Sequence, residues 1–78
     1  MDTTELTHLI DRLRDIPDPV ERTRTAAALI DALKDAQTRV KAVRADAAAE
    51  LRQGRTLRQV GELLGVSPAR VDQILRGK

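Results

Sequence analysis

The residue types best suited to chemistry gather near the end of the chain, where arginine, glutamine and serine occur at helical spacing. Arg70 and Gln73 are three residues apart, so they share one face of a helix. An arginine can donate two hydrogen bonds to guanine O6 and N7, and a glutamine can form a pair of bonds with adenine, one at N6 and one at N7. Ser67, just before them, can hold a phosphate. The pattern indicates a surface that reads base pairs.

The charge of the chain is unevenly distributed. Residues 51–78 hold six basic and two acidic side chains, a net charge of +4, whereas residues 1–50 hold eight basic and ten acidic ones, a net charge of −2. Phosphate contacts from Arg and Lys supply much of the affinity for nucleic acids. We expect Arg70 and Gln73 to reach base edges and Arg55 and Arg58 to touch phosphates. The full set predicted to contact DNA is Arg55, Thr56, Arg58, Ser67, Ala69, Arg70, Gln73, Arg76 and Lys78.

Two short helices are predicted to position these side chains. Thr56 can cap the first, with Gln59 closing a capping box three residues later. Gly65 can end that helix, because a residue without a Cβ tolerates the left-handed conformation. Ser67 can cap the second helix, and Pro68 suits its first turn, where no N–H is needed. The segment therefore predicts a helix-turn-helix.

The apolar residues of this segment follow the same division. One face of each helix carries them, and we expect these faces to form a core, with the small Gly61 where the first helix lets a partner approach closely. The positions are Leu57, Val60 and Leu64 in the first helix, Val66 in the turn, and Val71, Ile74 and Leu75 in the second. The polar residues from Ser67 to Arg76 then point outward.

The run TLRQVGELLGVSPARVDQIL resembles the helix-turn-helix in the C-terminal DNA-binding domain of bacterial sigma-70-family factors, and that of small actinobacterial sigma-factor-like proteins. The resemblance covers about the last third of the chain, and the remainder has nothing like the parts with which sigma factors engage polymerase. It implies a recognition helix in the major groove, with five positions facing DNA: Ser67, Ala69, Arg70, Gln73 and Arg76. Gly61 departs from the pattern, which usually has Ala there.

Upstream, the chain divides at Pro17 and Pro19. Before these prolines, Leu6, Leu9, Ile10 and Leu13 mark one face of a helix of about three turns. After them, Asp18 can cap a long helix that runs without Gly or Pro from Val20 to Arg52 and stops at Gly54. The predicted fold is all-α: an N-terminal helical hairpin whose long central helix leads into the C-terminal helix-turn-helix.

The long helix carries apolar residues at alternating spacings of three and four, at Ala26, Leu29, Leu33, Ala36, Val40, Val43 and Ala47. We expect Val43, Ala47 and Leu51 to pack on the helix-turn-helix, and Leu29, Ile30 and Leu33 to pair with the first helix. A hairpin of two helices buries little, and the chain has no Phe, Trp or Tyr. We therefore predict a homodimer through residues 1–42, a helical dimerisation region, with residues 43–78 as the DNA-binding region; a monomer with a bent helix is the alternative.

Catalytic and metal-binding residues are few. The single histidine, His8, has no cysteine or other evident ligand beside it, and carboxylate pairs such as Asp31 and Asp35 have basic neighbours at helical spacing. We expect no enzyme activity, metal or cofactor. The absence of Cys, of a targeting segment at the start and of a membrane-length apolar stretch favours a cytoplasmic protein that binds no membrane. The resemblance and the DNA-binding prediction together imply a place in the bacterial nucleoid.

These features together predict a sequence-specific DNA-binding protein that acts as a dimeric transcriptional regulator, with double-stranded DNA read in the major groove by the helix over residues 68–76. Two alternatives remain open. One is an architectural, nucleoid-type protein that binds DNA with little sequence preference. The other is a docking module on the transcription machinery, with RNA polymerase as a partner.

Overall fold

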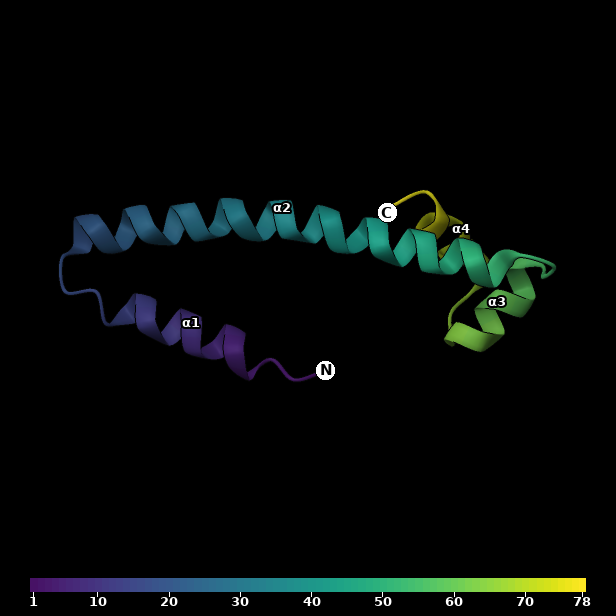
Figure 1. The fold of residues 1–78 in the computed structure, drawn as a ribbon, viewed down its shortest axis with the longest axis horizontal. Helices are drawn as coiled ribbons and strands as arrows, with labels where there is room; N and C mark the ends of the chain where they lie inside the picture. Colours follow the sequence, from purple (N-terminus) through teal and green to yellow (C-terminus); the bar gives the residue numbers. More distant parts are fainter. The chain divides into compact units, whose positions relative to one another are not determined.

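A computed structural model describes all of residues 1–78 and contains four helices and no strands (Figure 1). The helices are α1 (Thr4–Arg14), α2 (Pro19–Arg52), α3 (Leu57–Leu64) and α4 (Pro68–Leu75). The all-α prediction is confirmed, and the long helix begins and ends within one residue of the expected positions. The chain forms two compact units, Met1–Lys34 and Asp35–Lys78, which divide within α2.

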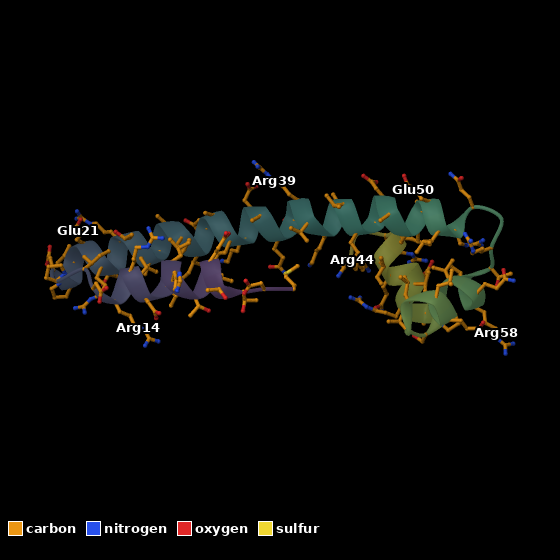
Figure 2. All side chains as sticks on the ribbon, turned by 60° about the horizontal axis from the view of Figure 1, so that its bottom comes forward. Arg14, Glu21, Arg39, Arg44, Glu50 and Arg58 are labelled. Carbon is orange, nitrogen blue, oxygen red and sulfur yellow. The ribbon has the colours of Figure 1, made fainter.

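The first unit is a helical hairpin. α1 folds back beside the first part of α2, as both general views show (Figures 1 and 2). Asp18 Oδ1 accepts a hydrogen bond from Val20 N at 3.2 Å, which satisfies one of the free amides at the start of α2. At the start of α1, the hydroxyl and the amide of Thr4 both donate to Asp2 Oδ1, and these bonds lower the pKa of the Asp2 carboxyl.

The hairpin buries very little. No residue of α1 is buried, and in the whole unit only Leu13, Ile16, Ala26 and Leu29 are half-buried. Of the three residues of α2 expected to pair with α1, Leu29 is half-buried, but Ile30 and Leu33 are exposed. The reason is geometric, since two helices can cover only the single stripe along which they touch. The exposed apolar side chains of the unit are Leu6, Leu9, Ile10, Val20, Ile30 and Leu33.

The second unit contains the predicted helix-turn-helix. Gly54, with φ of +71°, lies just beyond the end of α2, and Gly65, with φ of +73°, ends α3 in the left-handed conformation. Thr56 and Gln59 form the expected capping box, and Ser67 caps α4 with Pro68 in its first turn. The residues that start and stop both short helices are thus those expected from the sequence.

The core of this unit consists of Ala48 from α2, Val60 from α3, and Val71 and Ile74 from α4, none of them more than 6% exposed. Leu57, Val66 and Leu75 are half-buried around it. Leu64, which was expected on the inner face of α3, is instead exposed. It is the last residue of α3, directly before the left-handed Gly65.

The face of α2 that packs on the helix-turn-helix differs from the predicted one. Leu51 is half-buried as expected, but Val43 is 69% exposed and Ala47 is exposed, while Ala48 is buried beside the half-buried Arg44. The predicted positions 43, 47 and 51 and the observed positions 44, 48 and 51 have similar spacings, so spacing alone does not distinguish the two faces. One residue corresponds to a rotation of about 100° around the helix, and the observed contacts therefore lie on a neighbouring face.

Replacing Gly61 with Ala is expected to destabilise the second unit, although alanine favours helix by about 1 kcal/mol. A Cβ at this position would lie 2.5 Å from the backbone oxygen of Val66, which cannot rotate away. Overpacking of this kind costs about 1–3 kcal/mol, so the expected net loss is about 1 kcal/mol. Thermal unfolding followed by circular dichroism measures it, and Gly54→Ala, where a Cβ has open space but φ is positive, separates backbone strain from the clash. A Gly61→Ala protein more stable than the parent would contradict this packing.

Candidate nucleic-acid interface

α4 buries one side in the core and carries the predicted DNA-contacting residues on the remainder of its surface. Val71 and Ile74 are buried, and this fixes the orientation of the helix. Ala69 and Gln73 are exposed, whereas Arg70 is half-buried. At the start of the helix, Ser67 Oγ accepts a hydrogen bond from Arg70 N at 3.1 Å, so the serine stabilises the helix end nearest these residues.

The two residues expected to read bases are joined to each other. Arg70 Nη1 donates a hydrogen bond to Gln73 Oε1 at 3.3 Å. This bond restricts both side chains and leaves the amide nitrogen of Gln73 and the other guanidinium nitrogens of Arg70 as donors. Purine N7 and O6 atoms are hydrogen-bond acceptors in the major groove, and the linked arginine and glutamine together present donors to them.

Beyond them, Arg76 lies at the C-terminal end of α4 and forms an ion pair with Asp72, at 3.0 Å between Nη2 and Oδ2. Asp72 is half-buried, and Arg76 is exposed. Lys78 is exposed, and its amide donates to the Gln73 carbonyl at 3.0 Å. The carboxylate of Asp72 thus orients Arg76 and offsets part of its charge.

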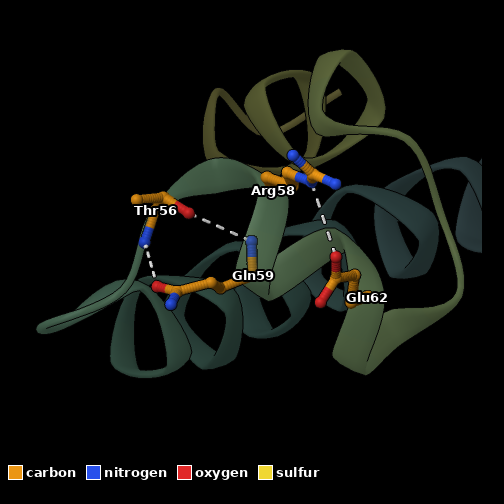
Figure 3. A network of polar contacts seen from close by, with 4 residues as sticks. All are labelled: Thr56, Arg58, Gln59 and Glu62. Atoms are coloured by element: carbon orange, nitrogen blue, oxygen red, sulfur yellow. Dashed lines mark hydrogen bonds and ion pairs between the residues drawn. The ribbon is translucent and has the colours of Figure 1, made fainter.

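The candidate residues at the start of α3 form a second group (Figure 3). Gln59 N donates to Thr56 Oγ1 at 3.1 Å, and Thr56 N donates to Gln59 Oε1 at 2.9 Å, so the amide and hydroxyl oxygen of Thr56 both serve the cap. Arg58 points outward and pairs with Glu62 at 3.5 Å, with side chains 84% and 69% exposed. An exposed arginine near a helix N-terminus is well placed for a phosphate.

Arg55 lies in the turn between α2 and α3. Its Nη1 donates to the carbonyl of Leu51 at 3.0 Å, and its own carbonyl accepts from the guanidinium of Arg52. The turn borders an open hollow of about 350 Å³ that is lined by Gly54, Arg55, Gln59, Glu62 and Leu63. The arginine is therefore held against the end of α2 with part of its guanidinium free to bind an anion.

The structure thus arranges the nine predicted residues in two groups, one around the start of α3 and one along α4. Sequence reasoning missed the acidic partners of the arginines, although the spacing of four residues between Arg58 and Glu62, and between Asp72 and Arg76, would have indicated them. It also missed Arg44, whose Nε and Nη2 are enclosed without a hydrogen-bond partner.

The chain contains no group of three or more His, Cys, Asp or Glu side chains that could hold a metal ion. None of its helices combines the length and the apolar character needed to cross a membrane. Comparison with models of known protein families, with curated proteins and with solved structures gives no match.

Proposed function

We propose that the protein is a sequence-specific DNA-binding protein, a dimeric transcriptional regulator that inserts α4 into the major groove. The observation that carries the proposal is the linked pair of half-buried Arg70 and exposed Gln73, on a helix whose inner side is buried through Val71 and Ile74. These are residue types that distinguish guanine and adenine in the major groove. The resemblance of residues 56–75 to the sigma-70-family helix-turn-helix supports the same reading.

Electrostatics favour this use of the second unit. The six basic side chains within residues 51–78 outnumber the two acidic ones, Glu62 and Asp72, and each acidic residue pairs with an arginine on its own helix. Counterions released from DNA by such basic residues would supply most of the affinity. The acidic partners would limit binding to DNA of any sequence, because they offset the charge of Arg58 and Arg76.

Arg58→Ala is expected to weaken binding to all duplexes equally and to reduce the slope of log K against log salt by about one unit, since one phosphate contact is lost. Glu62→Gln should have the opposite effect on affinity, because it frees Arg58 from its ion pair. Titration of labelled duplexes at four or more salt concentrations measures both. Arg14→Ala, which changes the same charge on α1, is the control, and a slope unchanged by Arg58→Ala would exclude a phosphate contact there.

Self-association is part of the proposal. The hairpin leaves leucine and isoleucine side chains exposed on both of its helices, among them Leu9 and Leu33. Apolar side chains in this number favour a partner surface, and two linked DNA-binding units bind far more tightly than one. Light scattering on the full chain tests this, with twice the monomer mass of 8.6 kDa expected at micromolar concentration.

A docking module on the transcription machinery is the second candidate, and one observation favours it. Leu63 and Leu64 at the end of α3 are 60% and 43% exposed, which is unusual for adjacent leucines on so small a unit. Binding of duplex DNA at low salt separates the two functions. If no duplex binds, the docking function replaces the DNA-binding one.

A further inference from the structure

A row of exposed apolar residues lies on the part of α2 that belongs to the second unit. Ala36, Val40, Val43 and Ala47 follow one another at spacings of four, three and four residues, so they share one face of the helix. The two valines are 66% and 69% exposed. We refer to these four residues as the α2 stripe.

The stripe is not used by the unit's own core. α2 packs on α3 and α4 through Arg44, Ala48 and Leu51, which lie on a neighbouring face. In Figure 2, Arg44 projects on the side of α4 and Arg39 projects on the opposite side. The α2 stripe therefore has the helix-turn-helix along one flank, and along its other flank the exposed residues Arg39 and Asp46.

We propose that the α2 stripe binds the α2 stripe of a second copy, with the two helices antiparallel and Val40 facing the partner's Val43. The inference rests on the proposed dimer and adds where on the second unit the copies meet and in which direction. In this register Ala36 faces the partner's Ala47, so all four positions of the stripe are paired. The small alanines at both ends allow the helices to approach closely.

Charge complementarity determines the direction. In an antiparallel pair, residues on the same flank meet each other, so each Arg39 lies beside the partner's Asp46, and symmetry repeats this pair. In a parallel pair, each flank meets the opposite flank of the partner, so each Arg39 lies beside the partner's Arg44. The symmetry of the dimer repeats this pair of like charges as well. Opposite charges therefore favour the antiparallel arrangement, and like charges oppose the parallel one.

The environment of Arg44 increases this difference. Its Nε and Nη2 are enclosed, and neither has a hydrogen-bond partner within the chain. A second arginine beside this half-buried cation is costly, because water screens the repulsion less there than at the open surface. In the antiparallel pair, the residue opposite Arg44 is the partner's Gln37, which carries no charge.

The antiparallel direction also suits the proposed function. Since Arg44 and Leu51 belong to the flank that packs on the helix-turn-helix, pairing of like flanks places both helix-turn-helix units on the same side of the helix pair. A parallel pair would place them on opposite sides. Two DNA-reading helices can engage one duplex only when they face it together.

A charge exchange tests the direction in the absence of DNA. Sedimentation equilibrium of the full chain should give dimer dissociation constants about tenfold higher for Arg39→Asp and for Asp46→Arg, and close to that of the parent for the double exchange. In a parallel pair Arg39→Asp would instead strengthen the dimer, since the new carboxylate would face the partner's Arg44. A strengthened dimer, or no rescue by the double exchange, overturns the proposal.

Arg39 also forms an ion pair with Asp35 on its own helix, at 3.0 Å. A control must therefore separate the loss of this ion pair from the loss of the contact with the partner's Asp46. Asp35→Asn removes it and leaves the proposed contact with the partner's Asp46 in place. The dissociation constant should then stay within a factor of two of the parent value. A tenfold increase with Asp35→Asn would assign the effect of Arg39→Asp to the helix itself and overturn the proposal.

Val43→Glu should raise the dimer dissociation constant by more than about tenfold without unfolding the chain, because the side chain is already 69% exposed in one copy. Leu63→Glu is the matched control, being 60% exposed in the same unit but on α3. Its dimer should be unaffected. Loss of the dimer with Leu63→Glu but not with Val43→Glu would place the interface on α3 and overturn the proposal.

Cross-linking gives an independent measure, since the chain has no cysteine of its own. A mixture of Val40→Cys and Val43→Cys proteins should form a mixed disulfide dimer faster than either protein links to itself, whereas a parallel pair would link each to itself. None of these measurements involves DNA. The proposed dimer can therefore be excluded while DNA binding is confirmed, and DNA binding can be excluded while the dimer is confirmed. A chain that is monomeric at all concentrations overturns the proposal.

Discussion

Ile74→Ala is expected to lower the free energy of unfolding by about 2–5 kcal/mol, because it leaves a cavity in the core of the second unit. Ile74 is 6% exposed and shares that core with Val60 and Val71, which are fully buried. Since small domains are stable by only about 5–15 kcal/mol, the loss is a large part of the total.

Denaturant unfolding followed by helical circular dichroism measures this loss. Leu63→Ala is the matched control, because it also removes apolar atoms but from a side chain of the same unit that is 60% exposed. The control should change stability by less than about 0.5 kcal/mol. If the Ile74→Ala protein were as stable as the control, the side of α4 that carries Ile74 would not be buried. The proposed orientation of Arg70 and Gln73 toward DNA would then be wrong.

Arg70→Ala and Gln73→Ala are each expected to weaken binding to a preferred site by about 1–3 kcal/mol and to relax the choice of base there. Scrambled duplexes should lose much less for Gln73→Ala, since glutamine contributes no charge. Because the two side chains are hydrogen-bonded, each truncation also frees the other, and the two losses should not add. The double variant should therefore differ measurably from the sum of the single ones.

A double-mutant cycle on specific and scrambled duplexes measures these losses, with Arg14→Ala again as the variant that changes charge away from α4. Equal losses on both duplexes for Arg70→Ala and Gln73→Ala would contradict base reading. That result would favour the architectural alternative, in which α4 holds DNA through its phosphates alone.

The sequence was most informative where single residues decide the backbone. Thr56, Gly65, Ser67 and Pro68 act through their own hydrogen bonds or dihedral angles, so their neighbours in space need not be known. The bounds of the helices and the burial of Val71 and Ile74 were therefore predictable.

The packing face of α2 was not predictable in the same way. From Ala45 to Ala49 every residue except Asp46 is alanine, so small apolar side chains occur on nearly all faces and the periodicity cannot select one. Packing against α3 and α4 selects the face with Ala48 and leaves Val43 exposed. Such a choice depends on contacts between residues far apart in the sequence, which a local pattern does not contain.

The ion pairs of the candidate interface were less predictable than the helix ends and more predictable than the packing face of α2. The spacing of Arg58 and Glu62 on one helix is a local signal, yet whether exposed side chains at this spacing pair depends on their rotamers. The bond between Arg70 and Gln73 has the same character. The spacing in the sequence indicates which side chains can pair, and the structure shows which of them do.

Selection of bound duplexes from a random pool by the purified full chain tests whether α4 reads the sequence of double-stranded DNA. We expect recovery of a consensus made of two related half-sites with purines opposite Arg70 and Gln73, and loss of that consensus with the Gln73→Ala protein. Recovery of duplexes without any consensus, or of none at low salt, would contradict it.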